Sequence, residues 1–274
     1  MSESTQVSRD PVGQAESTRA QRYWWDREAA DYYTEHGAFL GDAGFIWGPE
    51  GWSEADLGLL GPGGVAPKGP VLEIGAGAAQ CSRWLRARGT TVVASDLSGG
   101  MLAQSQAIDR AAAQPVPLVQ CDGARLPFAE AAFEVVFTAY GVVPFVADSA
   151  RVMREAARVL CPGGRFVFAT THPIRWAFPD VPGAAGLTAH QSYWDTRPYV
   201  ERDHRGEVTY VEHHRTLGER VREIVAAGLV LLDLVEPQWP ERNEQEWGGW
   251  SPTRGRVLPG TAIFVCGKPP ADVS

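Results

Sequence analysis

Between residues 69 and 172 the sequence alternates short apolar runs with segments of helical spacing. The runs PVLEIGAG, TTVVASD, PLVQCDG, FEVVFTAY and RFVFATTH predict strands, and AQCSRWLRARG, LSGGMLAQSQAIDRAAA and DSARVMREAARVL predict helices between them. The stretch CPGG, before the last of these strands, predicts a turn. Strands that alternate with helices form a mostly parallel sheet covered on both faces. We therefore expect an α/β fold.

The alternation breaks after residue 172. In residues 173–215, SYWDTRPYVERD and EVTYVEHHR flank the turn-like HRG, which predicts a β-rich insertion after the fifth strand. Helical spacing returns in TLGERVREIVAAG, where Thr216 and Glu219 form a capping box and Gly228 ends the helix. A Trp-rich loop without a crossover helix separates the strands LVLLDLVEP and TAIFVCGK, so we expect the last strand to run antiparallel.

The segments outside this pattern define the expected domain organisation. Residues 1–18 are polar, which predicts a disordered lead-in, and residues 19–68 predict an N-terminal helical cap. Within the cap, one helix is expected in QRYWWDREAADYYTEHG and another after the capping residue Ser53. Residues 69–268 then form the main domain, with 173–215 as a lid insertion, and 269–274 form a tail.

Charge and cysteine content narrow the range of partners. The formal net charge is −8 and no Lys/Arg block occurs, which argues against nucleic acid or an anionic membrane surface as the main partner. No apolar run approaches the length of a membrane span. The four cysteines are far apart and form no CxxC, which favours reduced thiols in a cytoplasmic protein over a metal site. We expect no metal, and a monomer or a homodimer.

The stretch VLEIGAGAAQ predicts a turn that holds a nucleotide-containing cofactor. Gly75 and Gly77 let the backbone approach a ligand and aim helix N–H groups at it. Glu73 precedes them, and Gln80 stands where a dinucleotide site has its third glycine. A carboxylate repels a pyrophosphate but attracts a cationic amino acid. S-adenosylmethionine, with its ammonium and sulfonium groups and no phosphate, therefore fits better than NAD.

Two further acids follow strand ends. Asp96 ends the second strand, where a carboxylate can accept hydrogen bonds from both hydroxyls of a ribose. Asp122 ends the third strand, before Gly123, and could accept from an adenine amino group.

With these acids in place, four ordered motifs carry a family resemblance. VLEIGAGAAQ, ASDLSGGML, QCDGARLPFAEAAFEVVFTAY and REAARVLCPGGRFVFAT resemble successive motifs of class I S-adenosylmethionine-dependent methyltransferases. They are similar to the small-molecule branch of the ubiquinone/menaquinone-methyltransferase type. The resemblance implies a Rossmann-like, seven-stranded, mostly parallel sheet with an antiparallel last strand, and S-adenosylmethionine as cofactor.

The resemblance also implies roles for particular residues. It places Glu73, Gly75 and Gly77 around the methionine part of the cofactor, and Asp96 on the ribose. The remaining cofactor contacts that it implies are Leu97 and Met101 on the adenine, Asp122 and Gly123 at the adenine edge, Ala139 and Tyr140 lining the site, and Tyr23 and Tyr33 closing over it. For Met101 an ordinary place in the core is the alternative. The stretch YGVV (140–143) departs from the polar or His-containing pattern of relatives, so no catalytic role is carried over to it.

Methyl transfer is an in-line displacement in which alignment and exclusion of water can supply roughly 7–11 kcal/mol of the barrier. A base is needed only where the acceptor loses a proton. His172 follows the fifth strand, at the edge where such sheets bind ligands, and is the candidate base. The alternative is a loop-entry motif in which this histidine hydrogen-bonds backbone.

The tryptophans indicate the kind of acceptor. Of ten, only Trp84 lies in the family motifs, and the others lie in the cap, the insertion and the late loop. Aromatic side chains there predict a lid over an apolar or aromatic small molecule, with Trp176, Trp194, Trp239 and His214 as acceptor contacts. The alternative is that they pack the lid onto the sheet. The predicted function is methyl transfer to oxygen, nitrogen or carbon; a non-catalytic S-adenosylmethionine- or S-adenosylhomocysteine-binding protein and an NAD(P)-dependent oxidoreductase are the alternatives.

Overall fold

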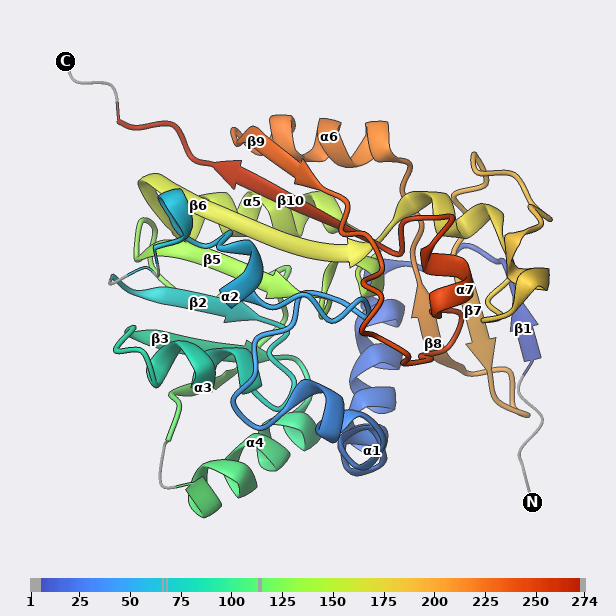
Figure 1. Ribbon diagram of the computed structural model, residues 1–274, viewed down its shortest axis with the longest axis horizontal. Helices are drawn as coiled ribbons and strands as arrows, with labels where there is room; N and C mark the ends of the chain where they lie inside the picture. The colour runs from blue at the N-terminus through green and yellow to red at the C-terminus, as the bar shows by residue number, and fades with distance from the viewer. Residues whose placement is uncertain (1–5, 66, 68, 113–114, 272–274) are drawn as a thin grey trace.

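A computed structural model describes residues 6–65, 67, 69–112 and 115–271, which form a seven-stranded sheet and a smaller three-stranded sheet (Figure 1). The large sheet has the order β4-β3-β2-β5-β6-β10-β9. Its strands are β2 (Val71–Ile74), β3 (Val92–Asp96), β4 (Leu118–Gln120), β5 (Phe133–Ala139), β6 (Leu160–Thr171), β9 (Val230–Val235) and β10 (Thr261–Gly267). β10 runs antiparallel to both of its neighbours. The expected fold class is therefore confirmed.

The helices form where the sequence indicates them, except that the first begins seven residues earlier than expected and the late loop contains a short helix that was not predicted. They are α1 (Gln14–Leu40), α2 (Glu54–Leu57), α3 (Gln80–Arg86), α4 (Gly99–Ala112), α5 (Ser149–Val159), α6 (Leu217–Ala226) and α7 (Pro252–Gly255). Ser53 caps α2, and Thr216 with Glu219 forms the predicted capping box of α6. Gly228 follows α6 with φ +76°, as a glycine that ends a helix does. None of the helices in the described ranges is long and apolar enough to span a membrane.

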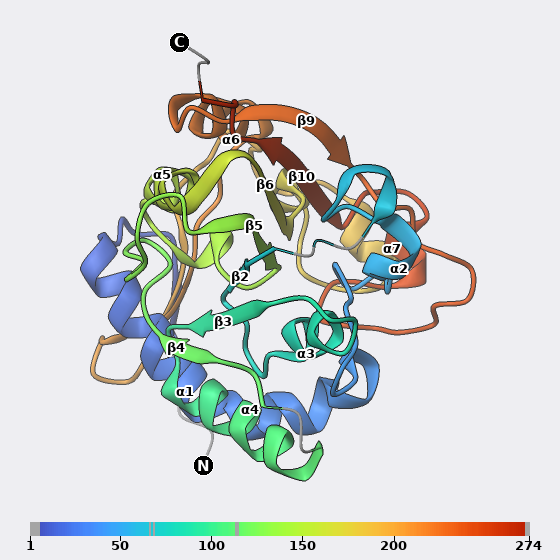
Figure 2. The same ribbon diagram turned by 90° about the vertical axis from the view of Figure 1, so that its left-hand side faces the viewer.

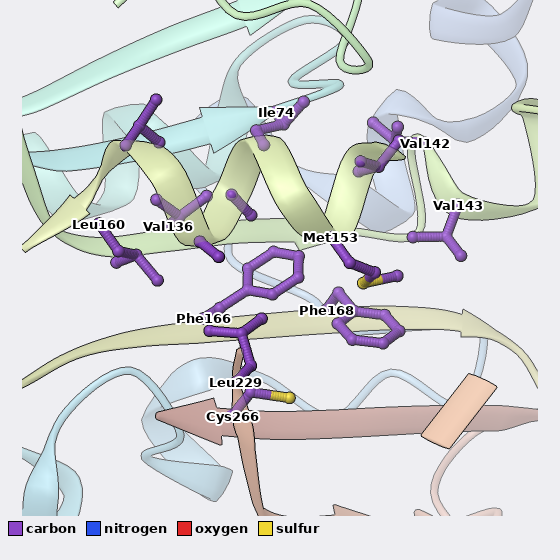
Figure 3. Packing of buried hydrophobic residues seen from close by; sticks show 14 of the residues in the cluster. Ile74, Val136, Val142, Val143, Met153, Leu160, Phe166, Phe168, Leu229 and Cys266 are labelled. Atoms are coloured by element: carbon purple, nitrogen blue, oxygen red, sulfur yellow. The ribbon is translucent and has the colours of Figure 1, made fainter. Parts of the chain in front are cut away.

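Successive side chains of a strand point to opposite sides, and the central strands of the large sheet are buried on both faces. Phe166 and Phe168 of β6 pack with Met153 of α5 on one face (Figure 3). Val167 and Ala169 belong to the core of the other face, with Trp47. Fully burying a side chain of this size contributes about 1.5–3 kcal/mol. The sheet is therefore a rigid platform for the turns at its carboxyl edge.

The expectation of a disordered lead-in is wrong for residues 6–18. Gln6–Ser8 forms β1, and α1 begins at Gln14. β1 pairs with β7 (Tyr199–Arg202), which pairs with β8 (Val208–Glu212), so the predicted two-stranded insertion gains a third strand. The small core that fixes this arrangement consists of Val12, Ala20, Val200, Val208 and Val211. The calls for residues 1–5 and 272–274 lie outside the described residues.

The stretch CPGG does not form a turn between two elements. It lies inside β6, where the pairing shifts from Phe133–Leu160 to Val135–Arg165 and leaves the intervening residues as a bulge. Gly163 takes φ +77°, and its N–H donates to the carbonyl of Lys268. A glycine-rich stretch can thus bend a strand without ending it.

Helix α1 joins the two sheets. It packs along α4, below the large sheet (Figure 2), and against β8 of the small one (Figure 1). Asp26 of α1 accepts hydrogen bonds from the hydroxyl of Ser98 at 2.8 Å and from the N–H of Gly100 at 3.0 Å. This contact anchors α1 at the carboxyl edge of the large sheet, over the turns that follow β2 and β3.

Candidate active site

A cavity of about 360 Å³ opens at the carboxyl ends of β2, β3, β4 and β5, beneath α1 and the loop that carries Trp247 and Trp250. Its volume is within the range of small-molecule and cofactor sites. The residues that the family resemblance assigned to the cofactor line this one cavity, with the exception of Tyr23: Glu73, Gly75, Gly77, Asp96, Leu97, Met101, Asp122, Gly123, Ala139, Tyr140 and Tyr33.

The glycine turn forms one end of the cavity. Gly75 and Gly77 have φ +68° and +54°. A Cβ on Gly75 would come within 2.5 Å of the side chain of Val142 and 2.9 Å of the carbonyl oxygen of Gly141. The turn therefore needs glycine both for its backbone angle and for the close approach of the segment after β5.

Glu73 places a buried carboxyl beside this turn. Its Oε2 accepts hydrogen bonds from the backbone N–H of Ser82 at 3.0 Å and from the Ser82 hydroxyl. Desolvation by burial raises the pKa of Glu73 to about 7. A carboxylate that is costly to ionise without a partner is suited to an incoming cation.

Asp96 is held rigidly at the next strand end. Its Oδ2 accepts from the N–H of Gly77 at 2.7 Å, and its Oδ1 accepts from the N–H of Ser98 at 2.8 Å. Burial raises the pKa of this carboxyl. Each oxygen keeps a further lone pair, so the group can still accept from two hydroxyls. Leu97 and Met101 line the same part of the cavity.

Asp122 connects the cofactor end to α1. Its Oδ1 accepts from the N–H of Ala124 at 2.8 Å, and its Oδ2 accepts from the hydroxyl of Thr18 at 3.3 Å. Thr18 also lines the cavity. Sequence reasoning missed it because the residue was assigned to a disordered segment.

Aromatic rings wall the other end of the cavity. Phe145 lies between Trp25 of α1 and Tyr210 of β8, with ring centroids 5.9 and 6.1 Å away. Trp247 stacks on His36 at 3.9 Å, which closes the late loop onto α1. The rings that line the cavity here differ from the acceptor contacts expected from the sequence.

A polar cluster lies beside these rings. Arg175 makes an ion pair with Asp180 at 2.8 Å, and its Nη1 is 3.8 Å from the Glu212 carboxylate. The Tyr210 hydroxyl donates to Glu212 at 2.6 Å. The buried Nε of Arg175 has no hydrogen-bond partner among the described residues. All four side chains line the cavity, so this polar cluster contains one buried donor without a partner among the described residues.

The structure places His172, the candidate base, beside the cavity and not in its lining. Its Nδ1 accepts from the backbone N–H of Ile174 at 3.1 Å, and its Nε2 is 2.9 Å from Glu236. Thr171 and Arg175 line the cavity, but His172 lies outside its lining. The histidine caps the turn after β6, as the loop-entry alternative proposed.

The predicted aromatic contacts also need correction. Trp194 is 77% exposed, and Tyr23 is exposed on the outer face of α1. Trp176 and Trp239 are buried outside the cavity lining, and Trp176 stacks on His214 at 5.5 Å. These side chains pack the insertion and the late loop, which was the stated alternative. Tyr33 does line the cavity, and its hydroxyl donates to Asp42.

Comparison with known proteins identifies the family. A model described as "Methyltransferase domain" matches residues 72–168. The demethylmenaquinone methyltransferase of Mycobacterium sp. (strain JLS) is 31% identical over 216 residues, which cover 76% of this chain and 79% of that protein. The demethylmenaquinone methyltransferase of Mycolicibacterium paratuberculosis is 40% identical over 116 residues, which cover 42% of this chain and 46% of that protein. The chain thus spans about half the length of this second relative.

A solved structure matches the fold over almost the whole chain. It is the Burkholderia thailandensis 1,6-didemethyltoxoflavin-N1-methyltransferase with bound S-adenosylhomocysteine, with a TM-score of 0.60 and 17% identity, covering 98% of this chain and 96% of that one. The sheet order, the acid-lined glycine turn and the mycobacterial relative all indicate the same family. The chain belongs to the class I S-adenosylmethionine-dependent methyltransferases, in the branch that includes the demethylmenaquinone methyltransferases.

Proposed function

We propose that this methyltransferase transfers the methyl group of S-adenosylmethionine to a planar aromatic small molecule. The observation that carries this proposal is one continuous cavity with two chemically different ends. One end has the glycine turn and three carboxyl groups, and the other has aromatic walls.

The residues at the first end fit the cofactor. Gly75 and Gly77, both with positive φ, bring the turn's backbone to the cavity wall without a side chain between it and a ligand. Glu73 would hold the ammonium group, Asp96 the ribose hydroxyls and Asp122 the adenine amino group. When bound there, S-adenosylmethionine supplies a methyl carbon that its sulfonium has already activated.

The second end orients the acceptor. Trp25, Phe145 and Tyr210 form a surface on which a flat ring can stack. The unused Nε–H of Arg175 can donate to an oxygen of the acceptor. Because the donor is buried, leaving it unpaired would cost about 1–3 kcal/mol, which favours acceptors that carry an oxygen at this position. The names of the mycobacterial relatives agree with a quinone-type acceptor.

The cap and the insertion form one lid in this proposal. Residues 19–68 contribute Trp25 and Tyr33, and residues 173–215 contribute Arg175 and Tyr210. Both segments exclude water from the reacting centre, so the protein supplies alignment and desolvation. Four unpaired cysteines agree with a reducing, cytoplasmic compartment. A monomer or a homodimer would serve equally well.

Two measurements test the proposal. Calorimetric titration should show S-adenosylmethionine binding that Asp96→Ala weakens at least tenfold. Formation of S-adenosylhomocysteine should follow when naphthols, quinols and phenols are supplied. The matched control is Asp203→Ala, because Asp203 is an exposed acid in the turn between β7 and β8. Binding without turnover on any aromatic acceptor would contradict the proposed function.

A further inference from the structure

A buried carboxyl lies behind the acceptor end of the cavity, outside the cofactor motifs. Glu50 follows the cavity-lining residues Gly48 and Pro49 and is 1% exposed. Its Oε2 accepts from the hydroxyl of Thr261 at 2.6 Å. Its Oε1 is buried and has no hydrogen-bond partner among the described residues. A group of this kind is costly to bury, so its presence requires a reason.

The local backbone is shaped to admit this carboxyl. A Cβ on Gly48 would be 2.5 Å from the Thr261 hydroxyl, and one on Gly260 would be 2.6 Å from Oε1 of Glu50. Glycines thus surround the Glu50–Thr261 pair at distances that no other residue allows without a shift.

Tyr140 connects this pair to the cavity. It ends β5 with φ +73°, in the left-handed region that a bulky side chain rarely takes. Its hydroxyl accepts from Thr171 at 3.4 Å, and Thr261 of β10 is the cross-strand partner of Thr171 of β6, which places it beside this hydroxyl. Tyr140 lines the cavity. The strained backbone therefore aims a phenol at the acceptor end and at a buried hydroxyl that already donates to Glu50.

We propose that Tyr140, Thr261 and Glu50 form a proton relay that removes the proton of a hydroxyl acceptor during methyl transfer. This inference rests on the proposed function. Tyr140 is the catalytic residue, because it borders the acceptor, and Thr261 and Glu50 are positioning residues that act through it.

The step balances in atoms and charge. The acceptor oxygen forms a bond to the methyl carbon, and the carbon–sulfur bond breaks with its electron pair on sulfur, so the cation becomes a neutral thioether. The acceptor proton passes to the oxygen of Tyr140, the proton of Tyr140 passes to Thr261, and the proton of Thr261 passes to the Glu50 carboxylate. The existing Thr261-to-Glu50 bond already points in this direction.

The electrostatic setting suits a base that works near neutral pH. Burial raises the pKa of Glu50 to about 7, against hydrogen bonds that lower it. The charged groups that act on Tyr140 are Glu50 on one side and Arg175 on the other. Thr261 and Thr171, on β10 and β6, are uncharged, so the titration belongs mainly to Glu50.

The test compares two acceptors with wild type and four variants. 1-Naphthol is un-ionised at pH 7 and needs proton removal, whereas 4-nitro-1-naphthol is largely ionised and does not. We expect Glu50→Gln and Thr261→Val to lower kcat for 1-naphthol at least tenfold and to flatten its rise with pH near 7. Both should keep the rate with 4-nitro-1-naphthol within about threefold. Thr261→Ser, which keeps the hydroxyl, should restore the wild-type profile.

The control is Glu54→Gln. Glu54 is also a buried carboxyl, but it accepts from Trp47 and from the N–H groups of Leu59 and Leu60, outside the cavity lining. Glu54→Gln should lower the free energy of unfolding without changing the pH dependence of kcat. An infrared titration supplies a readout without turnover: the carboxylic-acid C=O absorption that ionises near pH 7 should lose its Glu50 component in Glu50→Gln and keep the component of Glu73, whose pKa is also about 7.

The outcomes separate the two proposals. If the wild-type protein forms no S-adenosylhomocysteine with either naphthol, this result counts against the proposed function. The infrared titration then tests separately whether Glu50 ionises near pH 7, as the relay requires. Equal losses with both naphthols, a wild-type pH profile in Thr261→Val, or no band specific to Glu50 would each overturn the relay. If Glu50→Gln fails to fold, the Thr261→Val and Thr261→Ser pair still decides.

Discussion

The hydroxyl of Thr18 donates to Asp122 at 3.3 Å and so joins α1 to the cofactor end of the sheet. The bond lies at the wall of the cavity, and with the Asp26 contacts it keeps α1 closed over the site. A hydrogen bond to a charged group contributes about 1.5–3 kcal/mol. We expect Thr18→Val to raise the rate of S-adenosylmethionine dissociation roughly tenfold, as measured by stopped-flow tryptophan fluorescence.

Thr34→Val is the matched control for this prediction. Thr34 lies on the same helix, but its hydroxyl donates to the carbonyl of Ala30 on the exposed side. S-adenosylmethionine should dissociate from Thr34→Val at the same rate as from wild type. Identical rates for wild type and Thr18→Val would show that the contact does not hold α1 closed.

Cofactor binding should release a proton from Glu73. Burial holds the pKa of this carboxyl at about 7 in the free protein, and a bound ammonium group would lower it. Below pH 7 the group must lose its proton before it can pair with a cation, so affinity should rise with pH up to about 7 and then level off. Calorimetry in two buffers of different ionisation enthalpy should show a buffer-dependent heat at pH 6.5.

Glu73→Gln should abolish this buffer dependence and weaken binding at least tenfold at pH 8. If the variant keeps both the affinity and the proton release, Glu73 is not the group that meets the ammonium.

The free energy of unfolding should fall between pH 4.5 and 7 because of Glu50. Its pKa rises from the reference value of 4.5 to about 7 on folding, so the folded state binds more protons than the unfolded state in this window. Above pH 7, ionisation of the buried Glu50 lowers the free energy of unfolding by about 3 kcal/mol. Urea denaturation should therefore show Glu50→Gln to be more stable than wild type at pH 8, with the difference mostly gone at pH 4.5. A difference that does not change with pH would contradict the raised pKa.

Substitution of Arg175 should weaken binding of the acceptor and not that of the cofactor. Arg175→Gln removes the buried donor, leaves Glu212 without its cation and leaves Asp180 with only Arg254, at 4.0 Å. We expect the KM for an oxygen-bearing acceptor to rise at least tenfold while the Kd for S-adenosylmethionine stays within about twofold. Arg197→Gln, at an exposed ion pair with Asp195 in the same insertion, should change neither constant. A large loss of cofactor affinity in Arg175→Gln would contradict a role of this arginine that is confined to the acceptor.

The cofactor end could be predicted because its constraints are local. Glu73, Gly75 and Gly77 lie within one turn, and Asp96 follows the next strand in a fixed architecture. Strand periodicity and glycine chemistry determine where these groups lie, whatever covers them.

The acceptor end could not be predicted in the same way. Trp176 and Trp247 are equally aromatic and both lie in lid segments, yet one packs against His214 and the other lines the cavity. The difference arises from how the insertion and the late loop fold over each other, which depends on contacts far apart in sequence. Glu50 was missed for the same reason, since only the arrival of Thr261 from β10 makes it part of a network.

The pairing of β1 with β7 has a mechanical consequence. Because α1 follows β1 directly and also packs against β8, residues 6–40 and the insertion after β6 form a single body. That body covers the cofactor end through Thr18 and the acceptor end through Tyr210. Displacement of this body as a whole would therefore uncover both ends at once.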